Sequence, residues 1–271
     1  MDEPGQAAGR EVSLRDPAER SRLGAQRQAE LLGAPAPEPR TLFESSWRDY
    51  VFSEVWTRPG LDLRSRYLIA ISCAVCQGGR QDVLDGYIRG ALKRGELTLA
   101  EMREAVLQLA VYGGWSRGAA FDTAVTRVVR ELGLREAEYP PIRKDAWDPE
   151  QRIAEGSAGF TTVMCFAAPK PMSPYVGAGI INFVFGEMWL RPGLDQRSRR
   201  WITLVGVADS ATTTPIRTHV YAAMASGNAT AQEMQEFVLQ YAVDGSWPKA
   251  SYLQGVVFEM AERVRKGLPY E

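Results

Sequence analysis

The sequence predicts an all-α fold made of two tandem copies of one helical domain. Residues 51–66 read VFSEVWTRPGLDLRSR and residues 184–199 read VFGEMWLRPGLDQRSR, with twelve of the sixteen positions identical. A match of this length marks an internal duplication. Helix-capping signals and a helical spacing of apolar residues follow the block in both copies. We therefore expect a first domain over residues 1–137 and a second over residues 138–271.

Proline-rich stretches mark the loops around these helices. Residues 34–39 read APAPEP, and residues 167–174 read AAPKPMSP at the comparable place in the second copy. Proline lacks the backbone N–H donor that a helix needs. Each stretch is therefore expected to form a loop that interrupts the helical segment at the start of its domain. Residues 138–144, with two consecutive prolines, predict an exposed linker. The polar residues 1–20 are expected to be partly disordered.

A nearly continuous apolar run follows the shared block in each copy, at residues 67–76 and 201–208. The β-branched residues in these runs would also suit a strand. No hairpin signal follows and a helical pattern comes next, so buried helices are favoured. The next predicted helix of each copy stops at a glycine, Gly95 or Gly227.

The best-defined helix of each copy begins with a capping box. Thr98 precedes Glu101 by three residues, and Thr230 precedes Glu233 by the same spacing. At this spacing the hydroxyl and the carboxylate can each bond the other residue's backbone amide. Apolar side chains then recur at i, i+3, i+4 and i+7, and glycines end both helices.

The composition is that of an ordinary globular chain, with 271 residues, 45% hydrophobic, 24% charged and a formal net charge of −1. Basic residues are mixed among acidic ones, which argues against a nucleic-acid or membrane partner. The N-terminus lacks the apolar core of a signal peptide, and no stretch reaches the ~20 apolar residues of a membrane span. We therefore expect a cytoplasmic protein. Three cysteines are too few and too uneven for a disulfide framework.

The pattern Glu-x-Trp-x-Arg-Pro-Gly-Leu-Asp-x-Arg-x-Arg, with a downstream His, then Gly, then Thr-x-x-Glu, resembles the carboxymuconolactone decarboxylase family, which includes the AhpD-like alkylhydroperoxidases. The resemblance covers both halves. It implies an all-helical fold and homo-oligomeric assembly, here a trimer with six pseudo-equivalent domains. It also implies a small-molecule substrate and decarboxylation with no metal or organic cofactor. Members differ in chemistry, so each candidate residue is argued by itself.

His219 is the only histidine, which argues against a multi-histidine metal site. It falls at the family's histidine position, and Tyr87 replaces it in the first copy. The resemblance assigns it proton exchange with the substrate, which an imidazole does well near neutral pH. A buried structural histidine is the alternative. Glu187 would assist as acid or base, or would pair with a motif arginine; for its counterpart Glu54 the structural role is favoured.

Asp244 departs from the family pattern, which has an aromatic residue at this place, as Tyr112 shows in the first copy. Because Asp244 lies in the copy that has the histidine, it could orient His219 or raise its pKa. Ending the helix beside Gly245 is the alternative role.

Arg191 is the best candidate to anchor an acidic substrate, since a guanidinium binds a carboxylate through two hydrogen bonds. Internal ion pairs are favoured for Arg197 and Arg199. Trp189 and Tyr241 could line a pocket for a planar substrate, with core packing as the alternative.

Cys73 and Cys76 form a CxxC pair, but in the wrong register. In the family's peroxidases the resemblance places the pair directly before the histidine, so here buried free thiols are expected.

The sequence thus predicts a cofactor-independent enzyme whose active site lies in the second copy. The expected substrate is a small cyclic or aromatic-derived acid, lactone or ketone, and the reaction is decarboxylation or a related ring opening, cyclisation or isomerisation. A non-catalytic binding or scaffold protein is the alternative, and a thiol-dependent alkylhydroperoxidase is less favoured.

Overall fold

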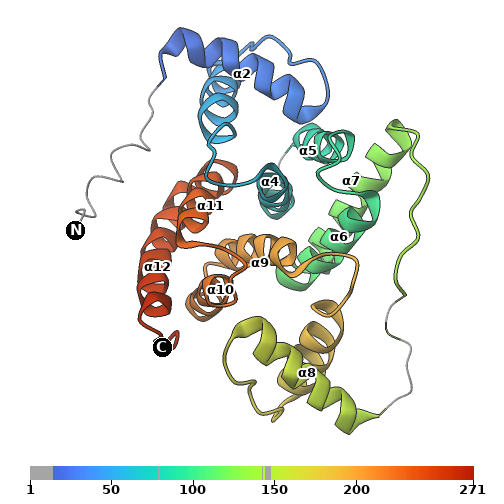
Figure 1. The fold of residues 1–271 in the computed structure, drawn as a ribbon. Helices are drawn as coiled ribbons and strands as arrows, with labels where there is room; N and C mark the ends of the chain where they lie inside the picture. Colours follow the sequence, from blue (N-terminus) through green and yellow to red (C-terminus); the bar gives the residue numbers. More distant parts are fainter. Residues whose placement is uncertain (1–14, 79, 142, 144–147) are drawn as a thin grey trace. The chain divides into compact units, whose positions relative to one another are not determined.

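The computed structural model describes residues 15–78, 80–141, 143 and 148–271. The secondary structure of these residues is helical without any strand, which confirms the predicted all-α class (Figure 1). The strand alternative for the two apolar runs is therefore wrong. The predicted disorder of residues 1–20 falls mostly outside the described residues, and so does part of the predicted linker at 138–144.

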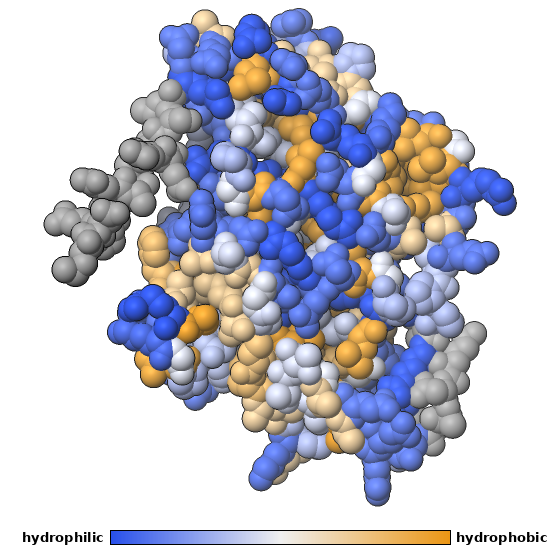
Figure 2. Space-filling view, viewed as in Figure 1, coloured by the Kyte–Doolittle hydropathy of each residue, from blue (hydrophilic) through white to orange (hydrophobic). Residues whose placement is uncertain are grey.

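The chain forms two compact units, residues 1–58 and residues 59–271. The predicted domain boundary between residues 137 and 138 stays a prediction. No helix of the described part is long and apolar enough to cross a membrane. The face in Figure 2 mixes hydrophilic and hydrophobic residues.

The order of helices in the first half returns in the second. The first half contains α2 (Pro17–Leu32), α3 (Leu42–Ser46), η1 (Trp47–Val55), α4 (Leu63–Gln77), α5 (Gln81–Lys93), α6 (Leu99–Gly113) and α7 (Trp115–Glu131). The second contains α8 (Pro149–Met164), η2 (Tyr175–Met188), α9 (Gln196–Ser210), α10 (Thr213–Ala225), α11 (Ala231–Asp244) and α12 (Trp247–Arg265). Apart from the short α3, each element has a counterpart. That the halves arose by duplication stays a prediction.

In the first unit, α2 packs against η1, a π-helix that the sequence did not predict. Gly24 of α2 lies so close to the backbone carbonyl of Arg48 that a Cβ would overlap it. Arg20 also joins the two helices, because its Nε lies 3.0 Å from Glu54 Oε1. The structural role favoured for Glu54 therefore fits the contact that it makes.

The second unit is built around α4 and α9, which pack against each other, and each also packs against a helix of the other half. Arg199 of α9 lies 3.0 Å from Glu104 of α6, and Arg66 of α4 lies 2.9 Å from Glu236 of α11. All four side chains are buried. A buried ion pair tolerates little displacement, so these two pairs fix α6 on the second half and α11 on the first.

Local signals decide the helix ends, as the sequence predicts. The hydroxyls of Thr98 and Thr230 accept hydrogen bonds from the amides of Glu101 and Glu233, and both glutamates bond back to the threonine amides. Both capping boxes are thereby confirmed.

Candidate functional site

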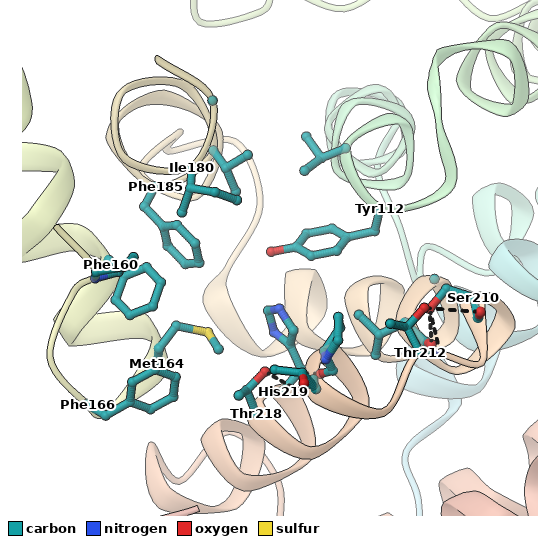
Figure 3. A pocket seen from close by; sticks show the side chains of 18 of the residues that line it. Tyr112, Phe160, Met164, Phe166, Ile180, Phe185, Ser210, Thr212, Thr218 and His219 are labelled. Atoms are coloured by element: carbon teal, nitrogen blue, oxygen red, sulfur yellow. Dashed lines mark hydrogen bonds between the residues drawn. The ribbon is translucent and has the colours of Figure 1, made fainter. Parts of the chain in front are cut away.

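A cavity of about 640 Å³ lies in the second unit, among α6, α8, η2, α9 and α10 (Figure 3). Phe160 and Met164 of α8 and Phe185 of η2 form an apolar wall, and Tyr112 of α6 lies across from it. His219 of α10 projects between these two sides. The cavity therefore combines an aromatic residue of the first half with the histidine of the second.

His219 is buried, with only 7% of its surface exposed. Arg200 Nη1 lies 3.4 Å from His219 Nδ1. A guanidinium can only donate, so Nδ1 accepts this hydrogen bond and the imidazole proton sits on Nε2. Burial and the nearby cation both lower the pKa of His219 well below its ordinary value. His219 is therefore a neutral imidazole whose Nε2–H is available to donate.

Arg200 is a buried cation directly behind His219. Burial lowers the pKa of Arg200 to about 10, which leaves it charged at neutral pH. It donates to the carbonyl of Val163 at 2.6 Å and to Asn228 Oδ1 at 3.4 Å, and its guanidinium lies 4.8 Å from the ring centroid of Trp189. No carboxylate among the described residues pairs with it. Its charge is thus free to stabilise negative charge that develops nearby.

Tyr112 fixes the orientation of the imidazole ring. The two rings meet edge-on, with centroids 5.2 Å apart and planes at 88°. The Tyr112 hydroxyl accepts a hydrogen bond of 2.8 Å from Trp189 Nε1, and burial raises the pKa of Tyr112 to about 12. Gly206 allows this approach of α6 to α9, since a Cβ there would lie 2.7 Å from the Cβ of Tyr112. Tyr112 is therefore a neutral phenol held in one place.

Glu187 does not line the cavity. Its Oε1 accepts a hydrogen bond of 3.0 Å from Arg152 of α8, which joins η2 to α8 as Arg20 and Glu54 join η1 to α2. The carboxylate is paired, as the alternative reading expected, but its partner lies outside the shared block. The role of acid or base for Glu187 has no support in this geometry.

Asp244 does not reach His219, so the predicted orienting role is corrected. Its carboxylate accepts hydrogen bonds from Gln240 at 2.5 Å and from the hydroxyl of Tyr87 at 3.5 Å. Burial raises the pKa of Asp244 to about 6. The physical reason is the exchange of helices: the end of α11 packs against the first half, beside Tyr87, whereas the end of α6 reaches His219.

Arg191 is not placed to anchor a substrate, which corrects a second prediction. It is buried and forms two-pronged hydrogen bonds of 2.6–3.0 Å with Glu104. It also donates to the carbonyls of Pro140 and Pro141. Nε and both terminal nitrogens are thus occupied, and the side chain ties the predicted linker to α6.

Trp189 and Tyr241 do not line the cavity either. Trp189 lies behind Tyr112 and stacks on Phe185 with ring centroids 6.2 Å apart, so it supports the wall from outside. Tyr241 is fully buried and packs on Phe237, with ring centroids 6.0 Å apart. Core packing, the alternative reading, describes Tyr241.

Sequence reasoning missed Arg200, although a signal for it exists. In the aligned block Arg200 directly follows the shared Arg-Ser-Arg, where the first copy has Tyr67. His219 was selected because the first copy has a different residue, Tyr87, at the aligned position. Arg200 and Tyr67 differ between the copies in the same way.

The two cysteines of the CxxC pair are buried, as predicted. Burial raises the pKa of Cys73 well above its ordinary value and that of Cys76 to about 11. Within the described part of the chain, no group of three or more His, Cys, Asp or Glu side chains is arranged to hold a metal ion.

Comparison with known proteins finds one family and two decarboxylases. The model of the carboxymuconolactone decarboxylase family matches residues 42–126, which include Tyr87 and Tyr112 but not His219. The 4-carboxymuconolactone decarboxylase of Acinetobacter baylyi is 29% identical over 92 residues, or 34% of this chain and 67% of that protein. The nitrosuccinic acid decarboxylase npaB of Metarhizium robertsii is 39% identical over 66 residues, or 24% of this chain. The chain spans 45% of the length of this second relative.

Proposed function

Because the chain belongs to the carboxymuconolactone decarboxylase family, we propose that it is an enzyme of the decarboxylase type whose reaction takes place beside His219. One observation carries the proposal. A neutral imidazole donor faces a cavity. Directly behind it lies the buried cation of Arg200, which pairs with no carboxylate among the residues that the structure describes. Such a pair stabilises negative charge at a defined place in the cavity.

Decarboxylation needs this stabilisation at an atom remote from the carboxylate. The bond between the carboxylate carbon and its neighbour breaks, CO₂ leaves, and the electron pair moves to an acceptor oxygen of the substrate. That oxygen accepts the hydrogen bond of His219 Nε2–H, and the charge of Arg200 favours it further. Water then supplies the proton that replaces CO₂. His219 thus acts as a hydrogen-bond donor that stabilises negative charge on the substrate oxygen. The proton exchange that the sequence predicted is not required of it.

The apolar wall would receive the departing carboxylate. Phe160, Met164 and Phe185 offer it no cation and no hydrogen-bond donor. A carboxylate is poorly stabilised in such surroundings, whereas neutral CO₂ is not penalised there. Moving the charge from the wall towards the Nε2–H of His219 is therefore favourable as the bond breaks.

The test is CO₂ release from 4-carboxymuconolactone, from nitrosuccinate and from a panel of aromatic acids. With any acid that turns over, His219→Ala should lower kcat/KM roughly 100-fold or more, the usual loss for one oxyanion donor. His219→Gln, which keeps an N–H donor, should recover part of this loss. Glu187→Gln, at a residue outside the cavity, should change it by less than about tenfold.

Unchanged turnover in His219→Ala would contradict the assignment of the site. Tight binding of an acid with no CO₂ release from any of the acids would favour the non-catalytic alternative.

A further inference from the structure

The hydroxyl of Tyr112 points into the cavity, towards the space between His219 and the apolar wall (Figure 3). Its oxygen accepts a hydrogen bond of 2.8 Å from Trp189 Nε1. An indole nitrogen only donates, so this contact uses a lone pair of Tyr112 and not its proton. Burial raises the pKa of Tyr112 to about 12, so the phenol keeps that proton at neutral pH.

A second hydroxyl, that of Thr203, also bonds Tyr112 and opposes the rise in pKa that burial causes. Thr203 Oγ1 accepts a hydrogen bond of 2.9 Å from Gln108 Nε2, and Gln108 Oε1 accepts one of 3.3 Å from Arg199 Nη1. Both Gln108 and Thr203 are fully buried. An amide nitrogen only donates, and Arg199 fixes which end of the amide faces Thr203. A chain of hydrogen bonds thus runs from Arg199 through Gln108 to Thr203.

The last proton of this chain goes to an anion in the cavity. Thr203 and Tyr112 each have one proton, and either hydroxyl is able to donate to the other. A hydrogen bond to a charged acceptor is roughly twice as strong as one between neutral groups. When an oxygen of the substrate gains negative charge, Tyr112 therefore donates to that oxygen and Thr203 donates to Tyr112. Each bond in such a chain strengthens the next.

One cation supports both donors that face this space. After burial, the charge of Arg200 is the cause that lowers the pKa of His219, and the same charge acts in that direction on Tyr112. The rings of Tyr112 and His219 meet edge-on with centroids 5.2 Å apart, which is close enough for both donors to reach one ligand atom. A carbonyl oxygen has two lone pairs and accepts two hydrogen bonds.

We propose that Tyr112 is a catalytic residue that donates a second hydrogen bond to the acceptor oxygen of the substrate, beside the one from His219. The inference deepens the proposed function and rests on it. It narrows the substrate to an acid whose acceptor is a carbonyl oxygen, or another oxygen with two free lone pairs. Trp189 and Thr203 are then positioning residues, because they hold the phenol with its proton directed at the cavity.

Tyr112→Phe keeps the ring that packs on His219 and removes only the hydroxyl. With any acid that turns over, kcat/KM should fall at least about tenfold, towards the ~100-fold loss of one oxyanion donor. Tyr175→Phe makes the same change at an exposed residue of the lining and should alter kcat/KM by less than about threefold. Full activity of Tyr112→Phe would overturn the proposal.

The imidazole signals of His219 separate donation from positioning. Nitrogen-15 labelling should show the proton of His219 on Nε2 in Tyr112→Phe as in the wild type, because the ring contact is kept. A loss of turnover together with a shift of this proton to Nδ1 would make Tyr112 a positioning residue and contradict the proposal.

Trp189→Phe shows whether a loss comes from the missing phenol or from an unpaired indole. In Tyr112→Phe the N–H of Trp189 loses its acceptor, which itself costs free energy. In the Trp189→Phe background this cost is absent, and Tyr112→Phe should still lower kcat/KM by a similar factor. No loss in that background would show that the hydroxyl serves only to satisfy the indole.

Binding of 4-nitrophenol tests the donor without any reaction. The anion is coloured, so absorbance reports the pKa of the bound phenol. This pKa should be about one unit higher in Tyr112→Phe than in the wild type, which is a tenfold weaker preference for the anion. Binding of 4-nitroanisole, which has no proton to lose, should be alike in the two proteins. An equal pKa of the bound phenol, or no binding of it by the wild type, would count against Tyr112 as a donor.

The two readouts separate this inference from the proposed function. If Tyr112→Phe raises the pKa of bound 4-nitrophenol and no acid loses CO₂, Tyr112 is an oxyanion donor and the proposed reaction is wrong. If CO₂ release depends on His219 and not on Tyr112, the reaction stands and the second donor is wrong.

Discussion

The hydroxyl of Tyr87 lies 3.5 Å from Asp244 Oδ1, so two residues that make the halves unequal contact each other. At the matching place, Tyr112 packs against His219. Each pair joins a residue of α5 or α10 in one half to the end of α6 or α11 in the other. The two equivalent contacts therefore differ in one partner: a tyrosine meets a histidine in one contact and an aspartate in the other.

Asp244→Asn should stabilise the protein more at about pH 8 than at about pH 4. Burial raises the folded pKa of Asp244 from 3.8 to about 6. As pH rises through this interval the unfolded chain ionises first, so the wild type loses stability that the asparagine variant keeps. The difference should grow by on the order of 2–3 kcal/mol, since one pKa unit corresponds to ~1.4 kcal/mol. Urea unfolding of both proteins at the two pH values measures it; a pH-independent difference would count against the buried, ionisable carboxyl.

The helices and their ends could be predicted because their signals are local. Thr98 with Glu101, and Thr230 with Glu233, lie within one helical turn and need no distant partner. The π-helical form of η1 and η2 could not be predicted, since the extra residue in each turn leaves no comparable local mark.

The sequence predicted only part of the candidate site, because the contacts of the site join residues that lie far apart in the sequence. The repeat identified His219, but nothing local tells that Tyr112 of the first half, and not Asp244 of its own half, lies beside it. Arg191 failed as a prediction for the same reason: its partner Glu104 lies 87 residues away. The mismatch of Arg200 with Tyr67 is a signal in the sequence that could have added Arg200 to the candidate residues.

Arg191→Met should destabilise the fold without abolishing turnover. The variant leaves Glu104 buried with Arg199 as its remaining cation, and removing one partner of a buried pair costs roughly 3–5 kcal/mol. Arg197→Met is the control, since Arg197 is partly exposed and such pairs contribute about 0–1 kcal/mol. Urea unfolding gives both losses. A full loss of turnover with unchanged stability would restore Arg191 as a substrate anchor.

The thiols of Cys73 and Cys76 should be inert in the folded protein. Both are buried and their pKa values are raised, so little reactive thiolate forms at neutral pH. A disulfide-exchange reagent should modify them only after denaturation, while the less buried Cys165 is the control. Cys73→Ser and Cys76→Ser should leave CO₂ release unchanged. Rapid reaction of both thiols in the native state would revive the peroxidase alternative.

His219 should stay neutral, with its proton on Nε2, well below the pH at which a free histidine titrates. It is the only histidine, so nitrogen-15 labelling of histidine yields a single pair of imidazole signals. Nδ1 should show the shift of an unprotonated nitrogen at about pH 7 and keep it at about pH 5.5. An imidazolium signal in the wild type near pH 6 would contradict the geometry.

Arg200→Met tests the cause of this behaviour. Without the cation the pKa of His219 should rise towards its ordinary value, and without the donor the proton should divide between Nδ1 and Nε2. Arg197→Met removes a cation on the same helix that pairs with Asp62 and Glu233. It should change neither the pKa of His219 nor the position of its proton.

Stability gives a second readout of Arg200→Met. A lowered folded pKa means that the unfolded chain takes up the proton first, so the wild type loses stability as pH falls below ~6.5. Arg200→Met should lose less over the same interval, and an equal loss would show that burial alone keeps His219 neutral.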